Sequence, residues 1–179
     1  MQFWKHIEAE YYNEIVSKTY NYIKYETDYL DKSKFKGPFI NLPHQKFIEY
    51  VPEINLAFES YGLFFENADI FLMWSNNDCA PRKDYTDSIA RINFPILNCE
   101  GTKTLFYNNL KIKSLILPTG APFYMTMNKD CVHVDEVEEV CATIVRISEG
   151  YNIVMKEDNF PRITLMLSFN PDVGLLLDD

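Results

Sequence analysis

The chain has 179 residues, of which 47% are hydrophobic and 24% are charged. This is enough for one globular domain with a full core, and the composition excludes a disordered chain. The net charge of −9 disfavours general binding to nucleic acid or to an anionic membrane surface. Aromatic residues make up 15% of the chain, a content that favours a β-rich core.

The N-terminus, the apolar runs and the cysteines indicate the cellular compartment. The N-terminus has no apolar segment typical of a signal peptide, and no run of about 18 apolar residues predicts a membrane span. The spacing of the four cysteines excludes zinc-ribbon and thioredoxin-type motifs, since no pair is separated by two residues. We therefore expect reduced thiols in a cytoplasm. The cysteines are Cys79, Cys99, Cys131 and Cys141.

The first third of the chain has helical periodicity. Trp4, Ile7, Tyr11 and Ile15 recur at spacings of three and four, which predicts one amphipathic helix over residues 3–30. This helix would pack on a sheet or dock a partner. A loop over residues 32–43 follows, and two short helices are expected over 43–50 and 54–61, the second ending at Gly62.

After Gly62 the pattern changes to short strand-like runs. Only the last run alternates strictly with period two. The sequence predicts an α+β protein in which a helical segment, residues 1–61, packs on an antiparallel sandwich or barrel, residues 62–179. The runs cover residues 69–74, 91–96, 102–107, 115–117, 138–147 and 163–169.

The C-terminus carries three adjacent leucines, Leu175 to Leu177. They either tuck into the edge of the core or form a contact with a partner. We expect a protein partner, and a homo-oligomer could form through these leucines or through the N-terminal helix. No nucleic-acid or membrane partner is expected.

Two segments carry a family resemblance. The first, residues 91–107, contains Asn93-x-Pro95-Ile96 and a Cys-Glu-Gly turn, and the second, residues 142–169, ends in Arg162-Ile163-Thr164. Together they resemble small 2-oxoglutarate/Fe(II) oxygenase-like proteins of marine bacteriophages, over about residues 62–170. The resemblance implies a double-stranded β-helix barrel of the jelly-roll or cupin-like type.

The metal-binding half of that family pattern is not readable. The resemblance places the His-x-Asp pair at Ala80 and Arg82 and the distal histidine at Asn152, and none of these residues is a competent iron ligand. An arginine there would also repel Fe(II). No metal or cofactor is therefore expected. Asp78, Asp84 and Asp87 are spaced irregularly, which favours loop solvation over a Mg²⁺ or Ca²⁺ site.

The anion-binding half is readable. Arg162 could present a bidentate fork to a carboxylate, and Thr164 would face the same side of its strand. Tyr107 could donate its hydroxyl group. The resemblance thus implies a vestigial 2-oxoglutarate site at Arg162, Thr164 and Tyr107. The alternative is an ion pair between Arg162 and a nearby acid, Glu157 or Asp158.

Three functional hypotheses follow. The first is a non-catalytic phage protein that acts as a protein-binding or virion-associated module, in the host cytoplasm or the virion. The second is an active Fe(II)/2-oxoglutarate hydroxylase with rearranged ligands, using His133 and Asp135. Against it, residues 129–139 look like an exposed acidic connection, which favours a surface histidine. The third is a metal-free carboxylate-binding, cupin-like sensor.

Overall fold

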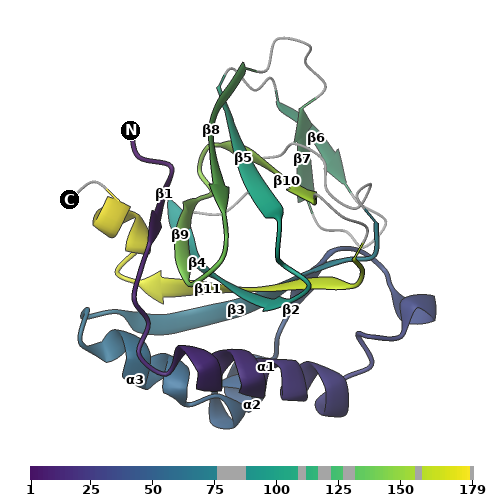
Figure 1. Ribbon diagram of the computed structural model, residues 1–179, viewed down its shortest axis with the longest axis vertical. Helices are drawn as coiled ribbons and strands as arrows, with labels where there is room; N and C mark the ends of the chain where they lie inside the picture. Colours follow the sequence, from purple (N-terminus) through teal and green to yellow (C-terminus); the bar gives the residue numbers. More distant parts are fainter. Residues whose placement is uncertain (76–87, 109–111, 117–121, 127–131, 156–158, 178–179) are drawn as a thin grey trace.

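The computed structural model describes residues 1–75, 88–108, 112–116, 122–126, 132–155 and 159–177. It has three layers: helices, a six-stranded antiparallel sheet and a three-stranded antiparallel sheet (Figure 1). The helices are α1 (Tyr12–Glu26), α2 (His44–Tyr50) and α3 (Glu53–Glu59), with short 3₁₀ helices at Lys32–Lys34 and Val173–Leu177. No helix in these ranges is long and apolar enough to cross a bilayer.

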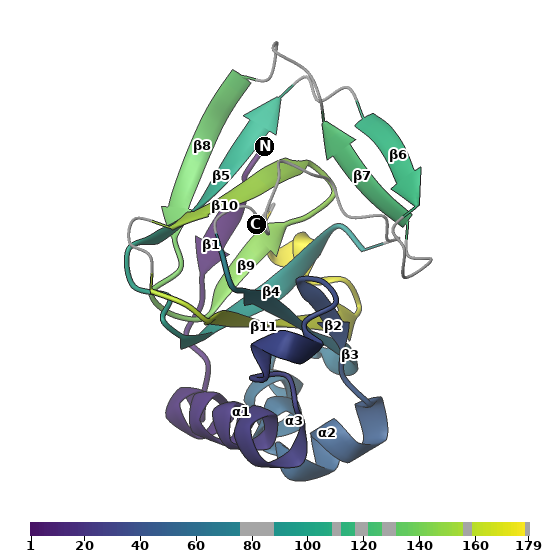
Figure 2. The same ribbon diagram turned by 90° about the vertical axis from the view of Figure 1, so that its right-hand side faces the viewer.

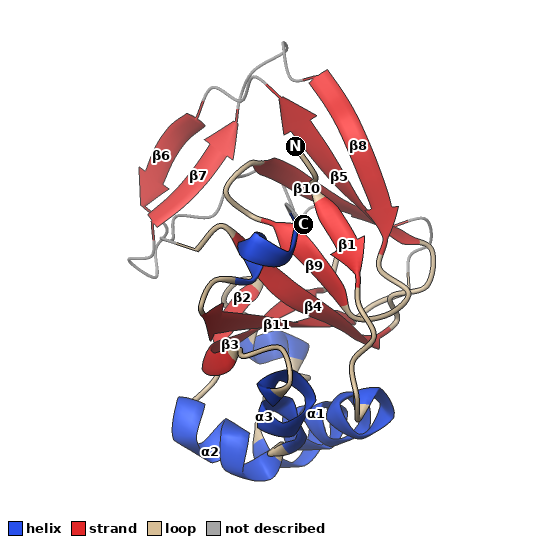
Figure 3. Ribbon diagram, turned by 90° about the vertical axis from the view of Figure 1, so that its left-hand side faces the viewer, coloured by secondary structure: helices blue, strands red, loops and turns tan. Residues whose placement is uncertain are grey.

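The large sheet, called sheet A, has the strand order β1-β9-β4-β11-β3-β2. The three helices cover one of its faces (Figure 3). The opposite face of sheet A lies under the smaller sheet, so both of its faces are covered (Figure 2). The strands of sheet A are β1 (Trp4–His6), β2 (Phe39–Asn41), β3 (Phe64–Met73), β4 (Ala90–Leu97), β9 (Thr143–Arg146) and β11 (Arg162–Asn170).

The smaller sheet, called sheet B, has the order β10-β5-β8. The chain crosses from sheet A to sheet B after β4, returns after β8, and crosses twice more around β10. This is the connectivity of a two-sheet jelly roll. The expected class, helices packed on an antiparallel double-stranded β-helix, is confirmed. The remaining strands are β5 (Thr102–Asn108), β6 (Ile112–Ile116), β7 (Pro122–Thr126), β8 (Val132–Glu138) and β10 (Gly150–Met155), with β6 and β7 paired as a hairpin.

The main apolar core lies between the helices and sheet A. Ile15, Tyr22 and Ile23 of α1 are buried in it, so the amphipathic face of this helix packs on the sheet. From β11, the alternating residues Ile163, Leu165, Leu167 and Phe169 enter the same core. The period-two pattern predicted for this strand therefore identifies its helix-facing side.

The predicted helix over residues 3–30 is wrong at its start. Residues 4–6 form β1, which pairs antiparallel with β9, and the helix begins at Tyr12. The spacing of Trp4 and Ile7 fits a helix, but the edge of sheet A satisfies the backbone groups of residues 4–6 instead. Tyr11, with φ 60°, turns the chain between the two elements.

Two further predictions need correction. Residues 129–139 were expected to be a connection, yet residues 132–138 form β8 on the edge of sheet B. Residues 138–147 were expected to be one strand, yet the chain leaves β8 at Glu138 and enters β9 of the other sheet at Thr143. The charged residues of β8 hide its strand pattern in the sequence. The run over residues 138–147 gives no local sign that the chain passes from sheet B to sheet A before β9.

The C-terminal leucines are mostly used within the fold. Leu177 is buried, Leu176 packs against the main core, and Leu175 is 60% exposed. The 3₁₀ helix at Val173–Leu177 packs closely on the residue before β4. A Cβ added at Gly174 would stand only 2.7 Å from Ile89 Cγ2. The expectation that these residues tuck into the core edge fits Leu176 and Leu177.

One carboxylate holds this helix in place. Asp172 accepts hydrogen bonds from the backbone N–H groups of Ile89 (2.8 Å), Ala90 (3.3 Å) and Gly174 (2.7 Å). The C-terminal segment is thereby attached to the first residues of β4.

We predict that Asp172→Ala lowers the free energy of unfolding by about 2 kcal/mol, because three backbone donors lose a charged acceptor. The melting temperature should fall by roughly 4–8 °C for a chain of this size. Asp172→Asn is the control and should fall less, since its remaining carbonyl oxygen still accepts from Ala90 or Gly174. Urea unfolding checks the result, and an alanine variant as stable as the wild type contradicts it.

Candidate functional site

Arg162 is the largest fully buried side chain among the described residues. Its neighbours in sequence along β11, Ile163 and Leu165, face the helices, so Arg162 faces the space between the two sheets. None of its three guanidinium nitrogens has a hydrogen-bond partner in the part of the chain that the structure describes. A guanidinium carries its charge throughout the physiological range, so this is a buried and unpaired cation.

Thr164 lies on the same face of β11 and is also buried. The turn after β4 lies beside these residues, because Asn98 Nδ2 donates to the Pro161 carbonyl (2.8 Å) and Cys99 Sγ to the Ile163 carbonyl (3.1 Å). Cys99 Sγ is 3.9 Å from Thr164 Oγ1. The Cys-Glu-Gly turn therefore contacts the first residues of β11.

The turn itself is closed by a backbone hydrogen bond. The Thr102 N–H donates to the Cys99 carbonyl (3.1 Å), and Gly101 at the third position has φ 68°, a value that favours glycine. Thr102 then enters β5 with its side chain buried, and its Oγ1 has no hydrogen-bond partner among the described residues. A second polar group without a partner thus follows directly on the turn that contacts Thr164 and the backbone on either side of Arg162.

A buried carboxylate joins the two sheets farther along. Glu139, just after β8, accepts hydrogen bonds from Thr104 Oγ1 of sheet B and from Asn93 Nδ2 of sheet A (3.1 Å). Each carboxylate oxygen has one donor, so this buried charge is solvated by the protein. Asn93 lies opposite Met166, four residues along β11 from Arg162. The two sheets are thus fixed to each other at the middle of β11.

Tyr107 and His133 lie elsewhere. Tyr107 follows the buried Phe106 on β5 and pairs across the strands with His133, their ring centroids 6.0 Å apart. The His133 side chain is 47% exposed and lies 3.8 Å from Glu136. Tyr107 is half-buried beside this half-exposed histidine, whereas Arg162 and Thr164 share the interior face of β11. The part of Tyr107 in the site therefore stays a prediction.

The location of His133 disfavours the hypothesis of a hydroxylase with rearranged iron ligands. The surface position expected for this histidine is observed, and it does not share the interior face that carries Arg162. Asp135 accepts a hydrogen bond from the Glu136 N–H (2.8 Å) on the same exposed strand. Within the described ranges, no three His, Cys, Asp or Glu side chains are grouped to hold a metal ion.

Several predicted positions fall outside what is described. Ala80, Arg82 and the aspartates of residues 78–87 lie in an undescribed range, as do Glu157 and Asp158. The backbone of Asn152 pairs with Leu105 in sheet B, and its side chain lies outside the described set. The inferred loss of iron ligands therefore stays a prediction.

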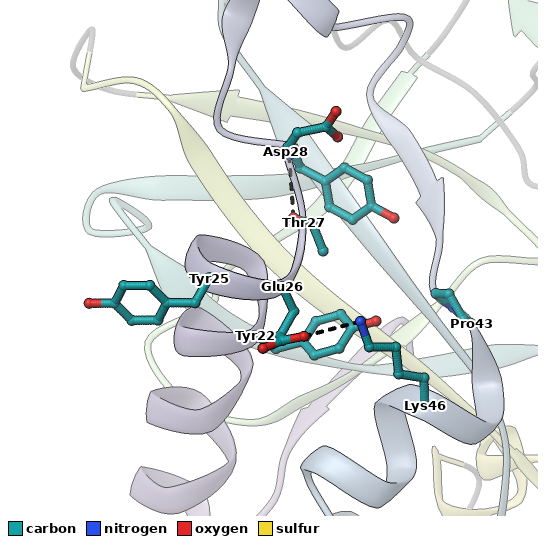
Figure 4. A pocket seen from close by; sticks show the side chains of 8 residues that line it. Tyr22, Tyr25, Glu26, Thr27, Asp28, Pro43 and Lys46 are labelled. Atoms are coloured by element: carbon teal, nitrogen blue, oxygen red, sulfur yellow. Dashed lines mark hydrogen bonds and ion pairs between the residues drawn. The ribbon is translucent and has the colours of Figure 1, made fainter.

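An open groove of about 480 Å³ lies on the helical side of the molecule (Figure 4). It is lined by the end of α1 and the start of α2, where Lys46 forms an ion pair with Glu26 (3.1 Å) and lies over the Tyr22 ring. Burial raises the pKa of the Tyr22 hydroxyl above its ordinary value. The groove's two carboxylates, Glu26 and Asp28, are already paired with Lys46 and Lys34, and sheet A separates the groove from Arg162.

Sequence reasoning identified Arg162 and Thr164 but missed the buried hydrogen bonds by which Asn93, Thr104 and Glu139 join the two sheets. Thr102, Thr104 and Phe106 at every second position were a usable signal for the inward face of β5. Glu139 had no such signal, because it follows Glu136 and Glu138 in an acidic run and only the crossing between sheets buries it.

Comparison with known proteins gives a limited result. No protein-family model matches the chain, and no curated protein matches it. Among solved structures, the chain is similar to a Pseudomonas putida prolyl-4-hydroxylase, with 10% sequence identity and a TM-score of 0.41. The similarity covers 94% of this chain and 92% of that one. At this level of identity, the hydroxylase activity is a statement about that protein alone.

We predict that Arg162→Met raises the free energy of unfolding by roughly 1–3 kcal/mol in carboxylate-free buffer, because methionine removes a buried charge that has no partner. Arg91→Met is the matched control on the adjacent strand β4. Arg91 pairs with Asp69 (3.3 Å), so its loss should lower stability. Denaturant unfolding of both variants is the measurement.

Opposite signs for the two methionine variants identify Arg162 as an unpaired charge. Equal destabilisation by both would show that Arg162 has an internal acidic partner, as in the alternative involving Glu157 or Asp158.

Proposed function

We propose that the protein binds a small carboxylate in its interior, with Arg162 as the cationic anchor and Thr164 as a hydroxyl donor beside it. The observation that carries this proposal is the fully buried guanidinium without a partner among the described residues. Burying a charge without compensation costs several kcal/mol, so folding alone gives no reason to keep arginine here. An anion that enters the site offsets this cost.

The geometry of the anchor favours a carboxylate. A guanidinium presents two parallel N–H donors that match the two oxygens of a carboxylate, and such bidentate bonds are among the strongest in proteins. Thr164 lies two residues away on the same face. Its hydroxyl is 3.9 Å from Cys99 Sγ, a weak contact, so it can donate a further hydrogen bond to a carboxylate oxygen.

The proposal is one of binding rather than turnover. It combines the expectation of a non-catalytic module with that of a metal-free carboxylate-binding protein, because both need only the residues that the described interior supplies. The partner, the phage setting and the virion association expected from the resemblance stay predictions, and the groove at Lys46 has no part in this function.

Binding is tested by thermal shift with a panel of short mono- and dicarboxylates, 2-oxoglutarate included, against sodium chloride at equal ionic strength. At a concentration 100 times the Kd, a ligand adds about 2.7 kcal/mol of stability, or roughly 5–10 °C in the melting temperature. We expect such a shift for at least one carboxylate in the wild type and none in Arg162→Met.

Arg91→Met serves as a control for general loss of stability, and it should keep the shift. If no carboxylate produces a shift, or if Arg162→Met responds like the wild type, the proposed function is wrong.

A further inference from the structure

On the β3 side, the neighbours of Arg162 are apolar. Across the strands its partner is Met73 of β3. Met73 belongs to a buried cluster that spans both sheets, because Ile153 of β10 packs in it from sheet B. The cluster comprises Phe71, Met73, Ile153 and Met166, with Phe39 and Phe160 packed against it. On this side Arg162 therefore adjoins Met73 and its cluster of thioether, aromatic and aliphatic groups, while Thr164 lies two residues along the same face.

The other charged groups of the described interior have partners. The part-buried Arg91 pairs with Asp69 at 3.3 Å, and Nε of the buried Arg146 donates to the Gln2 carbonyl at 2.9 Å. The Glu139 carboxylate is bonded to Asn93 and Thr104. Arg162 is thus the one buried cation in the described ranges that has no partner, and the Thr102 hydroxyl, which also lacks one there, is neutral.

We infer that the ligand of Arg162 is a monocarboxylate with an apolar body, such as a short-chain fatty acid. The inference rests on the proposed function and adds the class of ligand. The guanidinium would neutralise the ligand's single carboxylate. The apolar body of the ligand would contact cluster side chains that now pack on one another. Met73 and Met166 suit this replacement, because methionine side chains repack at low cost. A second carboxylate would be buried without a partner.

The test is a matched pair of ligands on the full-length wild-type protein. Hexanoate and adipate have the same six-carbon chain and differ in one terminal methyl or carboxylate group. We expect isothermal titration at neutral pH and constant ionic strength to give hexanoate a Kd at least tenfold lower than that of adipate. Arg162→Gln should abolish the heat of hexanoate binding, because an amide cannot neutralise the carboxylate.

The outcomes separate the two proposals. If adipate binds as tightly as hexanoate or more tightly, and this binding is lost in Arg162→Gln, the monocarboxylate inference is overturned and the proposed carboxylate-binding function stands. If neither acid binds in an Arg162-dependent way, and the thermal-shift panel also gives no response, the proposed function fails and the inference fails with it.

Discussion

The structure depends on the double burial of strand β11. This strand lies between β3 and β4 in sheet A, and eight of its nine residues are buried. One face must be apolar because the helices pack on it, and Leu165 and Leu167 meet that requirement. The other face lies under sheet B and carries Arg162 and Thr164. The period of two in a strand fixes which residues face each layer.

The parts of the fold that the sequence revealed are those with local signals. Alternation along residues 163–169 predicted β11, Gly62 predicted the end of α3, and Gly101 predicted the turn. The parts that were missed depend on distant neighbours. Residues 4–6 are a strand because the edge of β9 is available to them, and Glu139 is buried because Asn93 and Thr104 meet it there.

The candidate site divides in the same way. Arg162 and Thr164 were predicted together because two positions on one strand share a face. Tyr107 was assigned to the site by resemblance, and its place there stays a prediction; it follows the inward-facing Phe106 at a register shift in β5, with its ring beside that of His133. The apolar cluster around Met73 is assembled from both sheets and has no signature in any one segment. Under our proposal, this cluster favours an acid with a single charge over 2-oxoglutarate, a diacid.

The bonds of Glu139 restrict how such a ligand could enter. Asn93 and Thr104 fix the two sheets at a level about 13 Å along β11 from Arg162, from a rise of 3.3 Å per residue. The turn between β4 and β5 joins the two sheets at the other level, beside the start of β11, where Asn98 Nδ2 donates to the Pro161 carbonyl and Cys99 Sγ to the Ile163 carbonyl. The sheets are therefore held together on both sides of Thr164, and a ligand of Arg162 would have to fit without separating them there.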